Sequence, residues 1–483
     1  MNITKIIRNH IFVFKIIALS SLLYPAQGYA AQTTPKTLAL EIDHILSNAA
    51  LRNTQIGIKV VSLKNGEVLF EKNGEKLLIP ASNAKILTAA AALKEIGPQY
   101  KFLTKALTDG KIEGNKITGN LYIQGDGDTF FVTEMIYYFA NELAIRGFTG
   151  ITGDVVIDDF YFDRNYDVPP GDRAYVAPVS AVAANFNSIS LFIRPGNSNG
   201  SPAKVEIDPP NEFIKIINQA RTGGSKSTIS VIRKADGEKN IIVVSGSIPL
   251  GGKGERAYRS ISNPPMYAGA VLKSIFAQRG ITISGVIGHK ETPASARELL
   301  IYKSKSFDLV IKDLMNFSNN MIANQLIKAL GAHKYGAPGS MEKGLRAAKE
   351  SLASLGIKPE SFVMVDGSGY DRQNRVSADL LTTILKKMSE DMVLFPGFWF
   401  SLPVAGEEGT LERRFKSNGA KGKIRAKSGT ITGVATLAGY APTKDGELLA
   451  FAFLFNDPRG RTRELYSYQE KIGELLCNFT RQQ

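Results

Sequence analysis

Cysteine is nearly absent from this chain, since Cys477 is the single one among 483 residues. An intramolecular disulfide is therefore excluded, and the apolar pattern around Cys477 predicts a buried, unreactive thiol in a last helix. Cysteine clusters and an HExxH motif are also missing from the sequence. We therefore predict neither a metal nor a cofactor.

Histidine is almost as scarce, with only His10, His44, His289 and His333. None lies in a motif that would orient it as a base, so a Ser-His-Asp triad has little support. We expect surface or loop positions for these histidines. A serine nucleophile in this chain needs another base, and lysine is the remaining candidate.

Long apolar runs are missing beyond the N-terminus. Residues 11–23 form a run that is interrupted by Lys15, with a basic start before it and small residues up to Ala30 after it. So short and broken a run is a poor membrane span, and the pattern predicts a secretory signal cleaved near Ala30. Export without disulfides suits a bacterial periplasm or cell surface.

Acidic residues are outnumbered, 45 against 59 lysines and arginines, which gives a formal net charge of +14. Without Lys5, Arg8 and Lys15 of the predicted signal, the charge is 14 − 3 = +11. This favours electrostatic association with an anionic wall or membrane surface, although a merely soluble basic surface explains it equally well. We expect no nucleic-acid binding, because the chain is predicted to be exported and has no recognised motif.

A hydroxyl and an amine stand three residues apart at Ser82 and Lys85, where a helix is predicted to begin. Pro80 favours a first helical turn, and the alanine-rich run 89–93 is strongly helix-forming. Residues i and i+3 share a helix face, so the Lys85 amine can reach the Ser82 hydroxyl and take its proton. The start of a helix, where the dipole is positive, is a suitable place for a serine nucleophile.

The same spacing occurs twice more, at Ser201 and at Ser340. Ser201 lies in a loop with no helix signal after it, and Ser340 is more simply an N-cap serine. An N-cap serine with a solvated lysine also explains Ser82 from its local sequence. Other motifs elsewhere in the chain must therefore decide between an N-cap serine and a nucleophile at position 82.

Two further motifs follow Ser82, and each occurs once. Ser318-Asn319-Asn320 lies in a helical pattern, and Lys427-Ser428-Gly429 precedes Thr430 in a β-like segment. Ser-x-x-Lys, Ser-x-Asn and Lys-Thr/Ser-Gly in this order are the signature of the penicillin-recognising serine acyl transferases.

The distance from Ser82 to Ser318, 318 − 82 = 236 residues, requires a large insertion between the first two motifs. With this insertion the chain resembles the D-alanyl-D-alanine carboxypeptidase/endopeptidase family typified by penicillin-binding protein 4. Segments 153–159, 177–181 with Asn187, 245–250, 366–369 with 372–376, and 402–411 also resemble that family. The resemblance covers roughly residues 40 to 480.

The resemblance implies a role for each motif residue. Ser82 is expected to attack the penultimate D-alanine carbonyl with Lys85 as base, while Ser318 relays the proton and Asn320 holds Lys85. The substrate-binding residues are expected to be Lys427, Ser428, Gly429 and Thr430, together with Asp158 and Arg372 at the side-chain end of the stem peptide. A turn aspartate and an ion-pairing arginine explain Asp158 and Arg372 at least as well.

The chain departs from the family pattern at three places. Ser428 stands where threonine is more common. Asn319 replaces the usual aspartate of the second motif, and Asn324 replaces an acidic residue that the family commonly has shortly after it. Tyr370-Asp371 replaces the expected Leu-Ser. No catalytic group is lost by these changes. Their combined effect falls on substrate preference.

We predict a multi-domain α/β chain whose β-lactamase/transpeptidase-like catalytic domain carries a large β-rich insertion between the first and second motifs. The expected parts are a signal peptide (1–30), a discontinuous catalytic domain (31–100 and 292–483), an inserted β-rich domain (101–180 and 245–291) and a second inserted domain (181–244).

The expected activity is that of a DD-peptidase, which removes the terminal D-alanine of peptidoglycan stem peptides, cleaves their D-alanine cross-links, or does both. β-Lactams would acylate Ser82 in the same first step, and the reaction would then stall at the acyl-enzyme. A β-lactamase is the enzymatic alternative, but a Glu-x-x-Leu-Asn-like deacylation segment is missing. A non-catalytic wall-binding protein that keeps the fold is the alternative from another class, and the complete catalytic set argues against it.

Overall fold

The computed structural model describes residues 34–166, 168–236, 239–416 and 419–481. The predicted signal and its cleavage site lie outside the described residues. Within them, no helix has the length and apolar character needed to cross a membrane.

A five-stranded antiparallel sheet with the order β2-β1-β24-β23-β22 joins the two ends of the described chain. Its strands are β1 (Gln55–Ser62), β2 (Val68–Lys72), β22 (Arg425–Ile431), β23 (Val434–Pro442) and β24 (Leu448–Asn456). The predicted turn between β23 and β24 contains Gly446, whose φ of +83° favours glycine. β22 is an edge strand, so one side of it is free to face a cleft.

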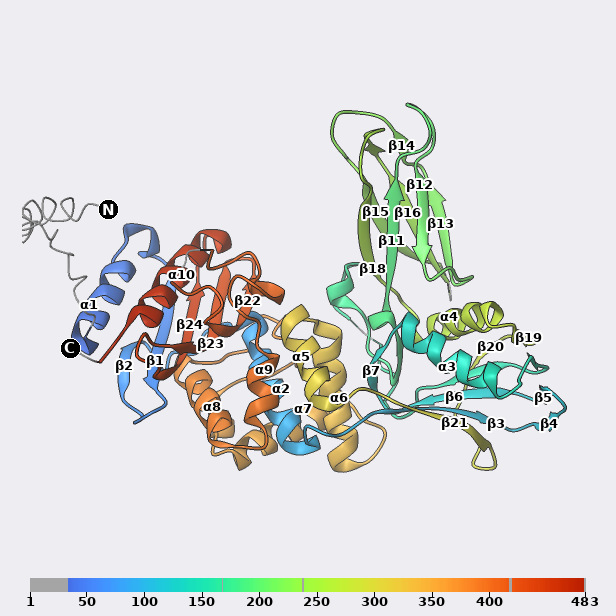
Figure 1. Cartoon of the computed structure of the whole chain (residues 1–483), viewed down its shortest axis with the longest axis horizontal. Coiled ribbons are helices and arrows are strands. Elements are labelled where there is room, and N and C mark those ends of the chain that lie inside the picture. The colour runs from blue at the N-terminus through green and yellow to red at the C-terminus, as the bar shows by residue number, and fades with distance from the viewer. Residues whose placement is uncertain (1–33, 167, 237–238, 417–418, 482–483) are drawn as a thin grey trace, which may run out of the picture.

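Helices cover both faces of this sheet (Figure 1). One face packs against α1 (Pro35–Leu46) and α10 (Thr462–Asn478). The other faces a helical layer of α2 (Ala84–Ile96), α5 (Phe307–Phe317), α6 (Asn320–Tyr335), α7 (Met341–Ser354), α8 (Ala378–Glu390) and α9 (Phe395–Ser401). Short 3-10 turns connect these elements: η1 (Ala49–Leu51), η2 (Ala81–Asn83), η5 (Pro359–Ser361) and η6 (Gly409–Leu411).

The first part of the insertion contains two sheets, ordered β20-β9-β6-β3-β21 and β19-β8-β5-β4. The strands and helices of this part are β3 (Leu103–Thr108), β4 (Lys111–Glu113), β5 (Lys116–Thr118), β6 (Leu121–Gly125), β7 (Asp128–Phe131), α3 (Thr133–Ile145), β8 (Gly150–Ile151), β9 (Val155–Asp158), α4 (Pro264–Gln278), β19 (Thr282–Ile283), β20 (Ile287–His289) and β21 (Arg297–Lys303). β21 pairs with β3, so this part extends past the predicted end at residue 291.

The second part of the insertion forms an arm at the top of Figure 1. Its sheets are ordered β12-β11-β18, β13-β16-β15 and β14-β17. The strands are β11 (Ser188–Arg194), β12 (Lys204–Asp208), β13 (Ile214–Asn218), β14 (Arg221–Thr222), β15 (Ser230–Asp236), β16 (Lys239–Ser245), β17 (Ser247–Ile248) and β18 (Glu255–Ser260). β17 and β18 lie beyond residue 244, the predicted end of this part, because they pair with β14 and β11.

Short elements link the arm to the rest of the chain. They are η3 (Ala174–Val176), β10 (Val182–Ala184), which pairs with β7, and η4 (Asn185–Asn187).

The α/β class and the β-rich insertion between Ser82 and Ser318 are both confirmed. Cys477 is buried in α10, as predicted, and burial raises the pKa of its thiol to about 11.

Candidate active site

Ser82 lies in η2, directly before α2, as the helix signals predict. The preceding residue, Ala81, has a φ of 46°, a left-handed conformation that is costly for a residue with a Cβ. Strain of this kind is concentrated at functional sites. Here it belongs to the turn that brings Ser82 to the head of the helix.

Lys85 is directed at Ser82. Its Nζ lies 3.0 Å from Ser82 Oγ, 2.8 Å from Asn320 Oδ1 and 2.8 Å from the carbonyl oxygen of Ser368. Ser201 and Ser340 have no such arrangement: Ser340 caps α7, as predicted, and Ser201 Oγ donates to the carbonyl of Ser198. The geometry therefore distinguishes Ser82 from the two other serines with the same spacing.

Burial gives the Lys85 amine the character of a base. The side chain is fully buried, and the loss of water lowers its pKa to about 7, against a weaker opposing effect of Asp366. A large fraction of Lys85 is then neutral near pH 7 and able to accept a proton. Burial, more than any neighbouring positive charge, is the cause of the low pKa.

The second motif joins α5 to α6. Ser318 is the left-handed C-cap of α5, with a φ of 53°, and the Asn319 side chain caps α6. Asn320 accepts a hydrogen bond from Lys85 and donates through Nδ2 to the Tyr175 carbonyl at 3.1 Å. One end of Asn320 thus orients the base, while its other end ties the inserted part to the site.

Lys427 on β22 lies behind the second motif. Its Nζ is 2.8 Å from Ser318 Oγ and 2.6 Å from the Ser428 carbonyl oxygen. The side chain is fully buried, and burial together with the charge of Lys85 lowers the pKa of Lys427 well below its usual range. Its amine is therefore presented to the cleft through Ser318 and does not line the surface itself.

The rest of the third motif shapes the strand against the nucleophile. A Cβ on Gly429 would lie 2.1 Å from Thr436 Oγ1 and 2.7 Å from the Pro80 carbonyl oxygen, so only glycine lets β22 pack this closely. Ser428 Oγ donates to Thr410 Oγ1 at 2.7 Å, and Ser428 is not among the residues that line the cleft. Thr430 lines the cleft, with its Oγ1 2.7 Å from the hydroxyl of Tyr466.

An open space of about 590 Å³, which we call the cleft, connects these groups. It is lined by Ser82, Tyr175, Ser318, Asn320, Gly369, Tyr370, Arg372, Thr430, Ile431 and Thr432. The exposed Arg372 donates to the Thr432 carbonyl at 3.0 Å, which places a guanidinium at the rim of the cleft. Arg372 is thus brought to the site.

Asp158 is not brought to the site. It ends β9, is only 3% exposed, and accepts hydrogen bonds from the side-chain amide of Gln124 at 2.8 Å and the backbone of Thr292 at 2.9 Å. Its carboxylate joins two segments of the insertion and does not line the cleft. This position gives no support to the expected contact of Asp158 with substrate.

The position of His289 differs from the expectation of a surface or loop residue. It ends β20, and its Nε2 lies 2.8 Å from a carboxylate oxygen of the buried Asp159, which also accepts from Ser180 and Tyr166. These hydrogen bonds hold the pKa of Asp159 below its usual value despite burial. The cluster is not among the residues that line the cleft, and it braces the insertion.

The 366–372 segment supplies contacts that its resemblance to the family did not specify. The Asp366 carboxylate accepts from the backbone N–H groups of Ser368 at 2.8 Å and Asp371 at 2.8 Å. This turn directs the Ser368 carbonyl at Lys85, and a Cβ on Gly369 would lie 1.8 Å from the Ala81 carbonyl oxygen. The Asp-Gly-Ser-Gly pattern was the available signal for these contacts.

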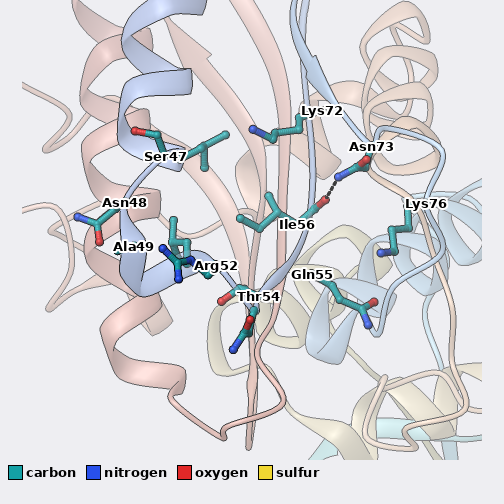
Figure 2. A pocket seen from close by; sticks show the side chains of 13 residues that line it. Ser47, Asn48, Ala49, Arg52, Thr54, Gln55, Ile56, Lys72, Asn73 and Lys76 are labelled. Atoms are coloured by element: carbon teal, nitrogen blue, oxygen red, sulfur yellow. Dashed lines mark hydrogen bonds between the residues drawn. The ribbon is translucent and has the colours of Figure 1, made fainter.

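A separate basic hollow of about 490 Å³ lies between the end of α1 and the strands β1 and β2 (Figure 2). Its cations are Arg52, Lys72 and Lys76, and Lys72 also forms an ion pair with Asp43 at 3.4 Å. None of the predicted site residues lines it.

A serine at the head of a helix, with the amine of a buried lysine 3.0 Å from its hydroxyl and the edge strand of an antiparallel sheet beside it, is characteristic of the penicillin-recognising serine peptidases. The fold and the cleft place this chain in that class. More narrowly, residues 38–473 match the D-Ala-D-Ala carboxypeptidase 3 (S13) family, to which the chain belongs. It is therefore a serine-type D-Ala-D-Ala carboxypeptidase.

Individual relatives agree with this assignment. The D-alanyl-D-alanine carboxypeptidase of Actinomadura sp. (strain R39) is 32% identical over 456 residues, which cover 90% of this chain and 84% of the relative. The crystal structure of penicillin binding protein 4 (dacB) from Haemophilus influenzae has a TM-score of 0.76 at 23% identity and covers 90% of this chain and 97% of that one. The same protein complexed with a novel β-lactam gives a TM-score of 0.73 at 23% identity, covering 91% and 99% of the two chains.

Proposed function

We propose that this enzyme cleaves peptidoglycan stem peptides through an acyl-enzyme on Ser82, acting on terminal D-alanine and on D-alanine cross-links. The contact that carries the proposal is the 3.0 Å distance between Lys85 Nζ and Ser82 Oγ, with the pKa of that lysine lowered to about 7 by burial. Lys85 takes the hydroxyl proton as Ser82 attacks the carbonyl. Water then hydrolyses the ester.

The leaving amine receives its proton through Ser318, whose hydroxyl lies between the cleft and Lys427. A released terminal D-alanine carries a carboxylate next to its new amine, and Thr430 at the cleft surface and protonated Lys427 behind Ser318 suit this carboxylate. A cross-link presents the same D-alanine carbonyl to Ser82, so the same site would serve both reactions.

The proposed setting is the periplasm. Residues 1–30 have the pattern of a secretory signal, and peptidoglycan is an extracytoplasmic substrate. The net positive charge and the basic hollow of Arg52, Lys72 and Lys76 support association with an anionic wall or membrane surface.

Covalent labelling tests the acyl-enzyme. Mature protein incubated with penicillin is expected to gain the mass of one opened penicillin, located by peptide mass spectrometry on the peptide that contains Ser82. The β-lactam ring carries a strained amide that Ser82 opens in the same way as the peptide bond. A label on Ser201 or Ser340, or active penicillin that leaves no adduct, would show that the nucleophile is misassigned.

The rate of labelling should depend on the neutral form of Lys85. Because burial lowers its pKa to about 7, the neutral fraction and the acylation rate rise as pH increases through about 7. A fluorescent penicillin followed in stopped flow between pH 5 and pH 9 measures this profile. A rate that falls over this range, or that continues to rise toward the ordinary lysine pKa of 10.5, contradicts a buried Lys85 base.

A further inference from the structure

A second hollow of about 880 Å³, which we call the aromatic groove, adjoins the cleft. The two share Tyr175, Ser318 and Asn320. The other residues lining the aromatic groove are Phe130, Val132, Thr133, Glu134, Ala174, Asn185, Phe186, Ser188, Ser190, Asp208, Arg256, Tyr258, Asp313, Phe317 and Asn319. Arg372 and Thr432 line the cleft but not the aromatic groove, so the catalytic centre lies between two openings of different chemistry.

The arm of the insertion supplies one wall of the aromatic groove. Ser190 on β11 pairs with Asp208 on β12 and with Tyr258 on β18, so these three side chains form one row across the sheet. The alternate residues of β11, such as Leu191, are buried in the core of the insertion. Tyr258 is 51% exposed, and an aromatic ring is thereby presented to the groove.

The catalytic part supplies the facing wall through Phe317, which is 66% exposed at the end of α5 and directly precedes Ser318. Phe130 and Phe186 contribute an aromatic pair with ring centroids 5.9 Å apart. Phe186 has a φ of 57°, and its neighbours Asn185 and Asn187 are also left-handed. A bulky aromatic residue in this conformation is a backbone outlier, and such outliers cluster at ligand sites.

We propose that the aromatic groove holds the amine-side stem peptide of a cross-linked peptidoglycan dimer, the chain that is released when the cross-link is cut. This inference rests on the proposed function of the cleft. In acylation, the bond from Ser82 Oγ to the D-alanine carbonyl carbon forms and the C–N bond breaks, while the serine proton passes through Lys85 and is delivered to the departing nitrogen through Ser318. The leaving side therefore lies at Ser318, where the groove begins.

Size and chemistry favour this occupant. A single D-alanine leaves most of an 880 Å³ groove empty, whereas a cross-linked substrate releases a whole stem peptide. Tyr258 and Phe317 can pack against its apolar surface, and Asp208 can accept from its amide N–H groups. Arg256 can bind a stem carboxylate.

Kinetics on two substrates test the inference. Tyr258→Ala is expected to reduce kcat/KM for a cross-linked muropeptide dimer about tenfold and to change kcat/KM for the monomeric pentapeptide less than twofold. Asp208→Asn is expected to act in the same direction with a smaller loss. Tyr138→Ala is the matched control, because Tyr138 is 52% exposed on α3 and does not line the groove.

Penicillin labelling of Ser82 in each variant shows that the catalytic part is folded. Three results would each overturn the groove assignment. The first is an equal loss of activity on dimer and monomer, and the second is unchanged cleavage of both substrates by Tyr258→Ala and Asp208→Asn. The third is a dimer-selective loss in Tyr138→Ala as large as that in Tyr258→Ala. A native enzyme that cleaves the monomer but not the dimer would also overturn it and would leave the carboxypeptidase proposal intact. Failure of the native enzyme on both substrates would instead refute the proposed function.

Discussion

Replacement of Lys85 by alanine or by arginine is expected to abolish acylation of Ser82, with a loss of about 100-fold or more in the labelling rate. Alanine removes the amine that lies 3.0 Å from Ser82 Oγ. Arginine keeps a long cationic side chain but has no neutral form near pH 7, so it cannot accept the proton. The rate of covalent labelling by a fluorescent penicillin measures both variants.

Folding must be shown separately for these variants, because Lys85 is fully buried and holds Asn320 and the Ser368 carbonyl. Circular dichroism and thermal unfolding provide that control. His44→Ala and His333→Ala are matched catalytic controls, since both residues are exposed and should leave labelling unchanged. A folded Lys85→Arg protein that labels at the native rate would contradict lysine as the base.

Three motifs that are far apart in the chain meet at the cleft, and each could be predicted because it coincides with a local helix or strand signal. Ser82, Lys85, Ser318, Asn320 and Lys427 come from these segments, and the hydrogen bonds of Lys85 and Lys427 join them. The large spacing between the first two motifs likewise required the insertion. These features depend on the kind and order of residues, which a sequence contains directly.

The burial depth of a side chain and the pairing of strands that are far apart in the chain could not be predicted from the sequence in this way. Asp158 precedes another aspartate after a β-like run, and nothing local distinguishes a buried carboxylate that bonds to Gln124 from one facing substrate. The end of the insertion was placed too early because the partner of β21 is β3, almost two hundred residues away. Tyr175 lies in the short 3-10 turn η3, which has no motif, so its place at the cleft had no local signal.

The depth of Lys427 bears on its expected role. Lys427 is expected to be a substrate-binding residue, whereas the structure places its Nζ 2.8 Å behind Ser318 Oγ and leaves the side chain fully buried. A substrate carboxylate in the cleft favours the protonated form of Lys427, and the attraction between the two charges is weakly screened at this depth. Lys427 also holds the Ser318 hydroxyl. The two roles predict different couplings to the substrate carboxylate.

Lys427→Ala is expected to reduce kcat/KM for peptides ending in D-Ala-D-Ala by a factor between about 30 and several thousand, since truncating one partner of a buried charge pair costs about 2–5 kcal/mol. A substrate with an amidated terminus should already be poor with the native enzyme and should lose little more with the variant. The two defects overlap because they remove opposite halves of one electrostatic interaction.

A double cycle of protein and substrate, measured across pH, separates the roles of Lys427. Burial is the cause of the low pKa of Lys85, so the activity profile of Lys427→Ala is expected to keep its position on the pH scale. Ser318→Ala is the matched control, because it removes the hydroxyl but keeps the charge. Full additivity of the Lys427→Ala and amidation defects at every pH would mean that Lys427 acts only by holding Ser318 and does not attract the carboxylate.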